Sequence, residues 1–268
     1  MRSRFSDQLK FRLIVASVLL SLGGCRSEHD PVLEDTFEQL YTVEPTADIN
    51  IQNGDGAILI YGSNVNQIRV QAVKKAYSRS RLMQIGINVS ASSRSISITT
   101  RLPAKPKWGL SDRSGTVDYT IVAPGTANIS GLNLDTGEIL LDGMRGRATR
   151  ARLGEGRMFL RNCFTGFDVA VRRGNLIVSY DWWEESNFSA HGNIEEGNAW
   201  AYFSPDAALN LLAQALNGKI GSDFETGKIA PSTSVGGTML DARVNGGSDA
   251  TLRLHVADGN IKIVEAIP

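Results

Sequence analysis

The sequence repeats a short phrase, which reads Gly137-Glu-Ile139-Leu-Leu141, Gly156-Arg-Met158-Phe-Leu160 and Gly174-Asn-Leu176-Ile-Val178. In each copy a glycine is followed by any residue, an aliphatic residue, any residue and a second aliphatic residue. Further copies are Gly56-Ala-Ile58-Leu-Ile60 and Gly259-Asn-Ile261-Lys-Ile263, and weaker copies start at Gly192, Gly218 and Gly227. From Gly137 through Gly156 and Gly174 to Gly192 the glycines recur at a near-constant step.

A glycine turn that leads into a strand with one apolar face, at a near-constant step, is typical of stacked coils. One coil cannot bury its apolar face alone, whereas a stack of coils buries a continuous core. The phrase therefore predicts an all-β chain, built as a single-stranded parallel β-solenoid with coils of about 18 residues.

The segment from Ser204 to Leu216 is ambiguous, because its apolar residues also fit a helical spacing. Pro205 precedes Gly218 by the same interval as Pro124 precedes Gly137. This internal match favours a strand that leads into a coil. At Gly192-Asn-Ile194-Glu-Glu196, Glu196 stands where the phrase expects a core aliphatic residue. We therefore expect a bulged strand or a solvent-exposed face there.

The order of these features resembles the bacterial putative-adhesin domains of unknown function. It is carried by the Gly56 phrase, by Val117-Asp-Tyr119-Thr-Ile121-Val-Ala-Pro124, by the run of glycine phrases, and by Leu252-Arg-Leu254-His-Val256-Ala-Asp-Gly259-Asn-Ile261. The resemblance covers most of residues 37–268 and implies an all-β solenoid in one domain. It brings no catalytic residues with it.

The N-terminus reads as an export signal over residues 1–24, with a basic start and an apolar run from Leu13 to Leu22. The run ends in Leu22-Gly23-Gly24-Cys25, which resembles the bacterial lipobox and implies a lipid on Cys25. Arg26 after this cysteine, in place of aspartate, implies the outer membrane. Residues 25–36 then form a polar spacer, which leaves Cys163 unpaired in the domain. We expect Cys163 to be a small buried residue near Phe164.

The charge balance argues against nucleic-acid binding. The whole chain has 28 basic and 28 acidic residues, and without residues 1–24 it has 24 basic against 27 acidic residues. Nucleic-acid binding normally needs a basic face. The histidines are scattered at positions 29, 191 and 255, so the sequence predicts no metal site and no cofactor.

Aromatic residues are the candidate binding platform, namely Phe164, Trp182, Trp183 and Trp200. Phe164, Trp182 and Trp200 recur at equal intervals of one expected coil, so in a regular stack they would form a ladder. A ladder that faces outward would stack sugar rings or a partner chain, and one that faces inward would be core packing. Trp182 and Trp183 are adjacent, so in a strand one of the two would lie near the surface.

Five carboxylates lie near these aromatic residues in the sequence, at Asp181, Glu184, Glu185, Glu195 and Glu196. Paired carboxylates beside an aromatic platform are what a glycosidase needs, whereas a solvated acidic rim needs no chemistry. The sequence favours a non-catalytic envelope lipoprotein, used for binding or scaffolding at the cell surface or in the periplasm, with a glycan or an envelope protein as partner. Two alternatives stay open, a polysaccharide-acting β-helix enzyme that uses carboxylates between Asp181 and Glu196, and a self-assembling envelope-stress module.

Overall fold

The structure is a computed structural model that describes residues 31–106, 112–223, 232–234 and 237–265. Residues Val32–Pro268 form one compact unit, and the fold reported is that of this unit. The predicted signal peptide, Cys25 and the first half of the predicted spacer lie outside the described residues, whereas the last four residues of the spacer, from Leu33, belong to the first strand. No helix in the described part of the chain has the length and apolar character needed to cross a membrane.

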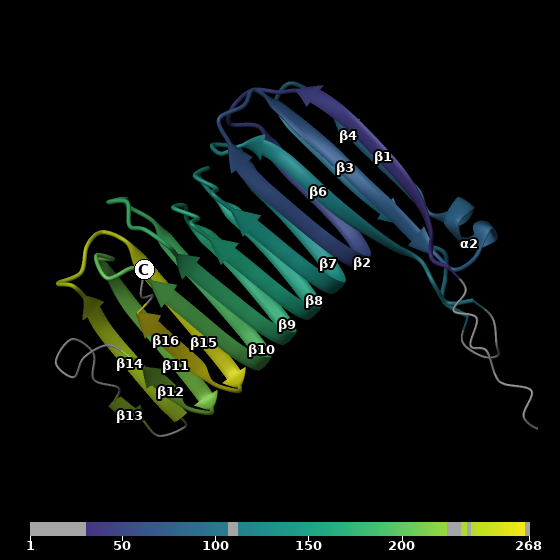
Figure 1. Ribbon diagram of the computed structural model, residues 1–268. Coiled ribbons are helices and arrows are strands. Elements are labelled where there is room, and N and C mark those ends of the chain that lie inside the picture. Colours follow the sequence, from purple (N-terminus) through teal and green to yellow (C-terminus); the bar gives the residue numbers. More distant parts are fainter. Residues whose placement is uncertain (1–30, 107–111, 224–231, 235–236, 266–268) are drawn as a thin grey trace, which may run out of the picture. The chain divides into compact units, whose positions relative to one another are not determined.

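The described strands form one mixed β-sheet of sixteen strands (Figure 1). Its middle is a run of five long neighbouring strands that are all parallel. These strands are β2 (Asp48–Ser63), β7 (Asn128–Asp142), β8 (Thr149–Arg161), β9 (Phe167–Tyr180) and β10 (Ser189–Phe203).

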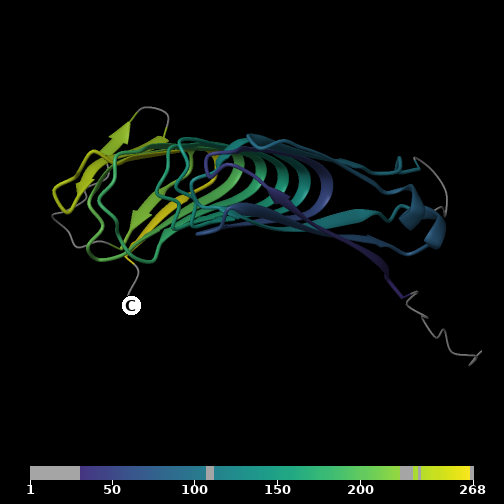
Figure 2. The same cartoon turned by 90° about the horizontal axis from the view of Figure 1, so that it is seen from above.

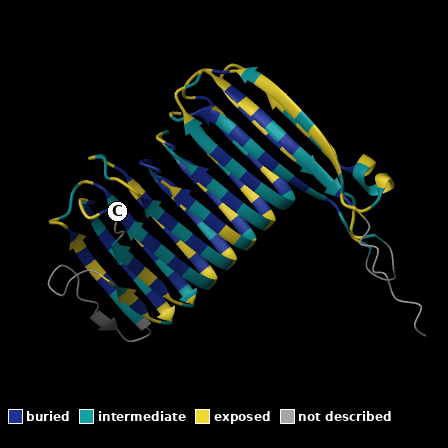
Figure 3. Ribbon diagram, viewed as in Figure 1, coloured by how far each residue is buried: buried dark blue, intermediate teal, exposed yellow. Residues whose placement is uncertain are grey.

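Each of these long strands bends at a glycine, so that it has a first arm before the bend and a second arm after it. In β9 the buried residues are Phe167, Val169 and Val171 before Gly174, and Leu176, Val178 and Tyr180 after it. The buried positions change from odd to even numbers at the bend, so both arms turn their apolar side chains toward the same core. Figure 2 shows these strands as a row of arches, and Figure 3 shows buried residues alternating along them.

The bends form a glycine ladder, because the bend residues of neighbouring strands are in register. The ladder consists of Gly56, Gly137, Gly156, Gly174, Gly197, Gly259 and Gly218, in spatial order. The first six have φ between +126° and +141°, a range that L-residues rarely adopt. A Cβ atom on any ladder glycine from Gly137 onward would also overlap the backbone oxygen of the preceding ladder glycine. The repeated glycine of the sequence is thus fixed by both backbone conformation and close strand approach.

At one end of the sheet, two strands from later in the chain lie beside β2. The strand β5 (Ser95–Arg101) is parallel to its first arm, and β6 (Thr116–Pro124) is parallel to its second arm. Antiparallel strands then complete this end, namely β4 (Gly86–Ala91) on β5, β3 (Gln67–Ala76) on β6 and β1 (Leu33–Thr42) on β3. The short helix α2 (Arg79–Gln84) follows β3, and Ser78 caps its N-terminus.

At the other end, the last strands of the chain are inserted into the stack. They are β15 (Thr251–Asp258) and β16 (Ile261–Glu265), which lie between β10 and the pair β11 (Leu209–Asn217) and β12 (Ile220–Ser222). Antiparallel strands β14 (Gly237–Val244) and β13 (Ser232–Ser234) follow on β11. The segment that also fits a helical spacing is therefore a turn at Ser204 to Ala207 followed by the strand β11, as the match between Pro205 and Pro124 predicted.

The all-β prediction is confirmed, but the prediction of a wholly parallel solenoid is not met, because the sheet is mixed. The antiparallel pairs lie at its two ends, where hairpin strands cover the free edges of the parallel run.

The predicted repeat at Gly192 is wrong, because the bend of β10 lies at Gly197. Gly192 instead faces the core, where the side chains of Leu176 and Leu254 fill the space beside it. Glu196 precedes the bend and is exposed, so it does not replace a core residue. The cause is the connection between β9 and β10, which spans residues 181–188 and is longer than the connection 162–166 between β8 and β9. The weak copy at Gly227 lies outside the described residues.

Candidate functional site

An aromatic cluster lies at the loop edge of the sheet, where the second arm of one strand connects to the first arm of the next. Tyr180 and Phe203 stack in register on β9 and β10, with ring centroids 6.1 Å apart and planes inclined by 7°. Trp183 packs edge-on against Tyr180 at 5.4 Å and against Phe164 at 5.9 Å. The Tyr180 hydroxyl donates to the carbonyl of Cys163 at 3.2 Å, and burial raises the pKa of this phenol. This cluster is core packing and anchors the connection 181–188.

Trp182 is held at the surface of this cluster, with 46% of its area exposed. Its ring lies 6.3 Å from Phe164, and its Nε1 donates to Oε1 of Glu184 at 2.9 Å. Glu184 in turn accepts from Nη2 of Arg145 at 2.5 Å and from Nε at 3.1 Å. The Arg145 guanidinium also lies 5.5 Å from the Phe164 ring centroid, in a cation–π contact. We call Trp182, Glu184 and Arg145 the Trp182 site.

The charges of the Trp182 site are already paired. The hydrogen bonds from Arg145 are the main reason that the pKa of Glu184 is lowered, and the Trp182 hydrogen bond acts in the same direction. Glu184 is therefore ionised at neutral pH and fixes the indole ring by a charge-assisted hydrogen bond. An aromatic plate held in one orientation loses little freedom when it binds a ligand.

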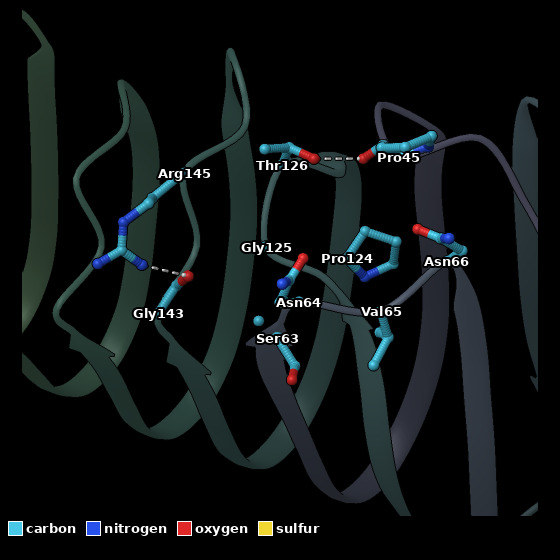
Figure 4. A pocket seen from close by; sticks show the side chains of 11 residues that line it. Pro45, Ser63, Asn64, Val65, Asn66, Pro124, Gly125, Thr126, Gly143 and Arg145 are labelled. Atoms are coloured by element: carbon cyan, nitrogen blue, oxygen red, sulfur yellow. Dashed lines mark hydrogen bonds between the residues drawn. The ribbon is translucent and has the colours of Figure 1, made fainter.

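A pocket of about 380 Å³ continues from Arg145 along the loop edge (Figure 4). Arg145 gives the pocket a positive charge, and Nη1 of this arginine donates to the carbonyl of Gly143 at 3.1 Å. Thr126 closes another side by donating from Oγ1 to the carbonyl of Pro45 at 2.7 Å. Apart from Arg145 the lining is uncharged and comes from Pro45, Gly62, Ser63, Asn64, Val65, Asn66, Pro124, Gly125, Thr126 and Gly143. Hydroxyl, amide and carbonyl groups of this kind can hydrogen-bond a polyhydroxylated ligand.

Trp200 lies elsewhere, on the second arm of β10. Its register partner on β9 is Ile177 rather than Trp182, so the expected ladder does not form through Trp200. The structure therefore brings Phe164, Trp182 and Trp183 together and separates Trp200 from them. The equal spacing in the sequence fails here because Trp182 lies in the long connection 181–188, outside the strands.

Trp200 belongs instead to an outer row of apolar side chains, which the sequence interpretation missed. The row crosses five neighbouring second arms in register and consists of Leu59, Leu140, Phe159, Ile177 and Trp200. All five face away from the core and are half-buried. A signal was present, because the variable position between the two aliphatic residues of each phrase is itself apolar in these copies. A strand with one buried face would carry a polar residue there.

The five candidate carboxylates do not form one group. Asp181 accepts hydrogen bonds from Asn162 at 3.1 Å and from Ser179 at 2.9 Å, and Glu184 is paired with Arg145. Glu196 lies beside the bend of β10 and accepts from Nε of Arg173 at 3.0 Å. Glu184 thus lies at the loop edge of the sheet, whereas Glu196 lies at the edge where the strands bend at the glycine ladder, which we call the bend edge. Within the described ranges no three His, Cys, Asp or Glu side chains are grouped so that they could hold a metal ion.

The fold is similar to that of a solved structure of a protein named for cell adhesion. The chain is similar to the crystal structure of a putative cell adhesion protein from Clostridium sporogenes, with a TM-score of 0.50 and 15% identity over 87% of this chain and 100% of that chain. The likeness lies in the fold. A putative adhesin from Bacteroides fragilis also matches, with a TM-score of 0.27 and 10% identity over 87% of this chain and 97% of that chain. No family model and no curated protein matches the chain.

Proposed function

We propose that this protein is an exported envelope lipoprotein with an adhesin-like, non-catalytic domain that binds a glycan at the Trp182 site and the adjoining pocket. The observation that carries the proposal is that Trp182 is 46% exposed although its neighbours are anchored in the core. An exposed indole beside a fixed ion pair and a polar pocket that is uncharged apart from Arg145 matches a sugar, which has apolar C–H faces and a rim of hydroxyl groups.

The N-terminal sequence supports export and lipid anchoring. The basic start, the apolar run and Leu22-Gly23-Gly24-Cys25 match a lipoprotein signal, and Arg26 favours the outer membrane. The polar residues that follow connect the proposed lipid to β1. A rigid sheet at the end of such a tether is suited to presenting a binding site at the envelope.

A non-catalytic role is supported by the state of the carboxylates. A glycosidase needs one carboxyl group with a raised pKa as its general acid, and a second carboxylate nearby. Glu184 is the carboxylate that contacts the exposed indole, and its pKa is lowered by Arg145. We therefore assign Glu184 a positioning role toward Trp182.

The test is binding of the full chain in detergent to an immobilised panel of neutral and acidic oligosaccharides. Trp182→Ala should weaken binding about two- to thirteenfold, since stacking of one aromatic ring contributes roughly 0.5–1.5 kcal/mol, and should leave the melting temperature almost unchanged. Tyr77→Ala is the matched control, because Tyr77 is also aromatic and 58% exposed but lies far from the site in sequence. Equal binding by Trp182→Ala and the native chain would refute this site. Binding to an envelope protein in place of every glycan would change the ligand class.

A further inference from the structure

The outer row is flanked on both sides by ion pairs between the same two strands. Oε2 of Glu138 on β7 lies 3.0 Å from Nη2 of Arg157 on β8, before the row. Oδ2 of Asp142 on β7 lies 2.6 Å from Nη2 of Arg161 on β8, after the row. In both pairs the acid belongs to β7 and the base to β8, while Leu140 and Phe159 lie between them.

The outer row is specific to the second arms. On the first arms, the corresponding outward positions of neighbouring strands carry Arg150, Asp168, His191 and Arg253, which are all exposed and polar. The outer face of the first arms is thus solvated, as is usual, while the outer face of the second arms carries five apolar side chains in one line. An apolar line with a polar rim is typical of an interaction surface.

The distribution of charge on the outer row is complementary to itself. A two-fold axis that runs parallel to the strands between β7 and β8 would place Glu138 opposite Arg157 of a second copy. The same axis would place Asp142 opposite Arg161 of that copy, and Leu140 opposite its Phe159. Leu59 would then meet the Ile177 of the second copy. An axis centred on β8 would instead place Arg157 against Arg157, which is unfavourable.

We infer that the outer row is the contact surface of a homodimer, in which two copies pack their second arms face to face about this axis. A two-fold contact uses the same patch on both copies, so a self-complementary patch is what it requires. Aligned packing of two sheets at about −30° is a standard arrangement. The flanking ion pairs then become a four-charge network across the contact, because each acid gains a second arginine.

The chain direction is compatible with this arrangement. The strand β1 is antiparallel to β3, which is antiparallel to β6, so β1 runs in the direction of the second arms. Leu33 therefore lies at the bend edge. An axis parallel to the strands keeps their direction, so both copies would begin β1 at the same edge. If the proposed lipid anchor holds, both anchors would leave the dimer toward one membrane.

The size of the surface indicates a weak contact. The face of the second arms spans seven strands, in the spatial order β6, β2, β7, β8, β9, β10 and β16. With strands about 4.8 Å apart and arms of about five residues, this face measures roughly 30 by 15 Å. This outline is smaller than the ~800 Å² per partner of a standard interface. Confinement to one membrane would strengthen such a contact by raising the effective concentration. In solution we expect association in the micromolar to millimolar range.

The experiment uses two single variants of the full chain, Glu138→Arg and Arg157→Glu, in sedimentation over this concentration range. Alone, each places like charges opposite each other and should raise the dimer dissociation constant at least about tenfold. Mixed in equal amounts, the two should form a heterodimer with nearly native affinity, because the arginine introduced in one chain then faces the glutamate introduced in the other. Neither chain regains its internal Glu–Arg pair in this mixture, so recovery can arise only from contact between copies.

The matched control is Arg152→Glu, which breaks a comparable 3.1 Å ion pair with Asp168 on the outer face of the first arms. It should leave association unchanged.

A second variant, Phe159→Glu, should abolish association in every mixture. A native chain that stays monomeric, or a mixture no more associated than its components, would overturn the homodimer. Loss of oligosaccharide binding in Phe159→Glu, with a monomeric native chain, would assign the row to a glycan instead. Trp182→Ala tests the proposed function separately, since it leaves the outer row intact.

Discussion

Gly156 lies beside Gly137 so closely that a Cβ atom on Gly156 would overlap the backbone oxygen of Gly137. The two residues are register partners on β8 and β7, and each has φ of +136°. The same relationship recurs along the glycine ladder, where the long strands turn from first arm to second arm. The spacing of the strands at the bend therefore depends on the absence of a side chain at each ladder position.

Gly156→Ala should destabilise the domain. A non-glycine residue in such a backbone conformation costs about 1–3 kcal/mol, and the overlap with Gly137 must be relieved by separating the strands. We expect a loss of about 2–4 kcal/mol and a melting temperature roughly 5–15 °C lower, measured by thermal denaturation.

Gly86→Ala is the control for the same chemical change. Gly86 is exposed on β4, and the atom nearest to an added Cβ is the Cβ of Arg101, at 3.7 Å. This variant should be neutral or slightly stabilising, because alanine restricts the unfolded chain. Equal melting temperatures for Gly156→Ala and Gly86→Ala would contradict the role given to the ladder.

The assignment of the arms to a single core can be tested on β9. Val178→Asp should unfold the domain, because Val178 is 1% exposed and an unpaired carboxylate would enter the core. Ala170→Asp on the same strand faces outward, beside Arg152 of β8, and should keep the native fold. Circular dichroism and denaturant titration of the two variants make the comparison. A cooperatively folded Val178→Asp protein would show that this position is not in the core.

The sequence predicts the local elements of this fold better than their order in space. The bend at Gly174 follows from its own phrase, because a glycine turn and the alternation after it are local properties. The insertion of β15 beside β10 does not follow, because Leu252 and Leu254 would suit any neighbouring strand equally well. Hydrophobic alternation fixes which face of a strand is buried, but it does not choose the partner.

The sequence does not predict the arrangement of the candidate site, because the repeated phrase gives no sign that the connection between β9 and β10 is long. The repeat predicts that Trp182 lies in a regular coil, whereas the connection 181–188 places it outside the strands, with Glu184 and Arg145. Arg145 lies far from Glu184 in the sequence, so no local pattern predicts their pairing. The burial of Cys163 was predicted correctly, because a lone cysteine next to Phe164 behaves as a small apolar residue.

Cys163 also predicts a pH dependence of stability. Burial raises the pKa of its thiol from 9.0 to about 12. Above pH 9 the unfolded chain therefore releases a proton that the folded chain keeps, so this thiol lowers stability as the pH rises from 9 toward 12. The slope is about 1.4 kcal/mol per pH unit at most. Native protein should thus lose stability relative to Cys163→Ala over this range in denaturant titrations, and a constant difference between the two would refute the shift. In native protein the thiol should not react with a maleimide.

The proposed anchor leads to a prediction that also uses both cysteines. Cys25→Ser removes the sulfur to which the lipid would be attached, so this variant should remain an unprocessed precursor or leave the membrane fraction. Two acyl chains bury many methylene groups, each contributing about 0.8 kcal/mol, so their loss should be decisive for membrane binding. Cys163→Ala should stay with the membrane, because Cys163 is buried in the sheet domain. Fractionation of envelopes and mass spectrometry of the N-terminal peptide make the measurement. A Cys25→Ser chain that is cleaved and still sediments with membranes would show that the protein is held there by another means. The proposed dimer would then no longer be supported by a shared lipid anchor, but the mixture of charge variants would still test it.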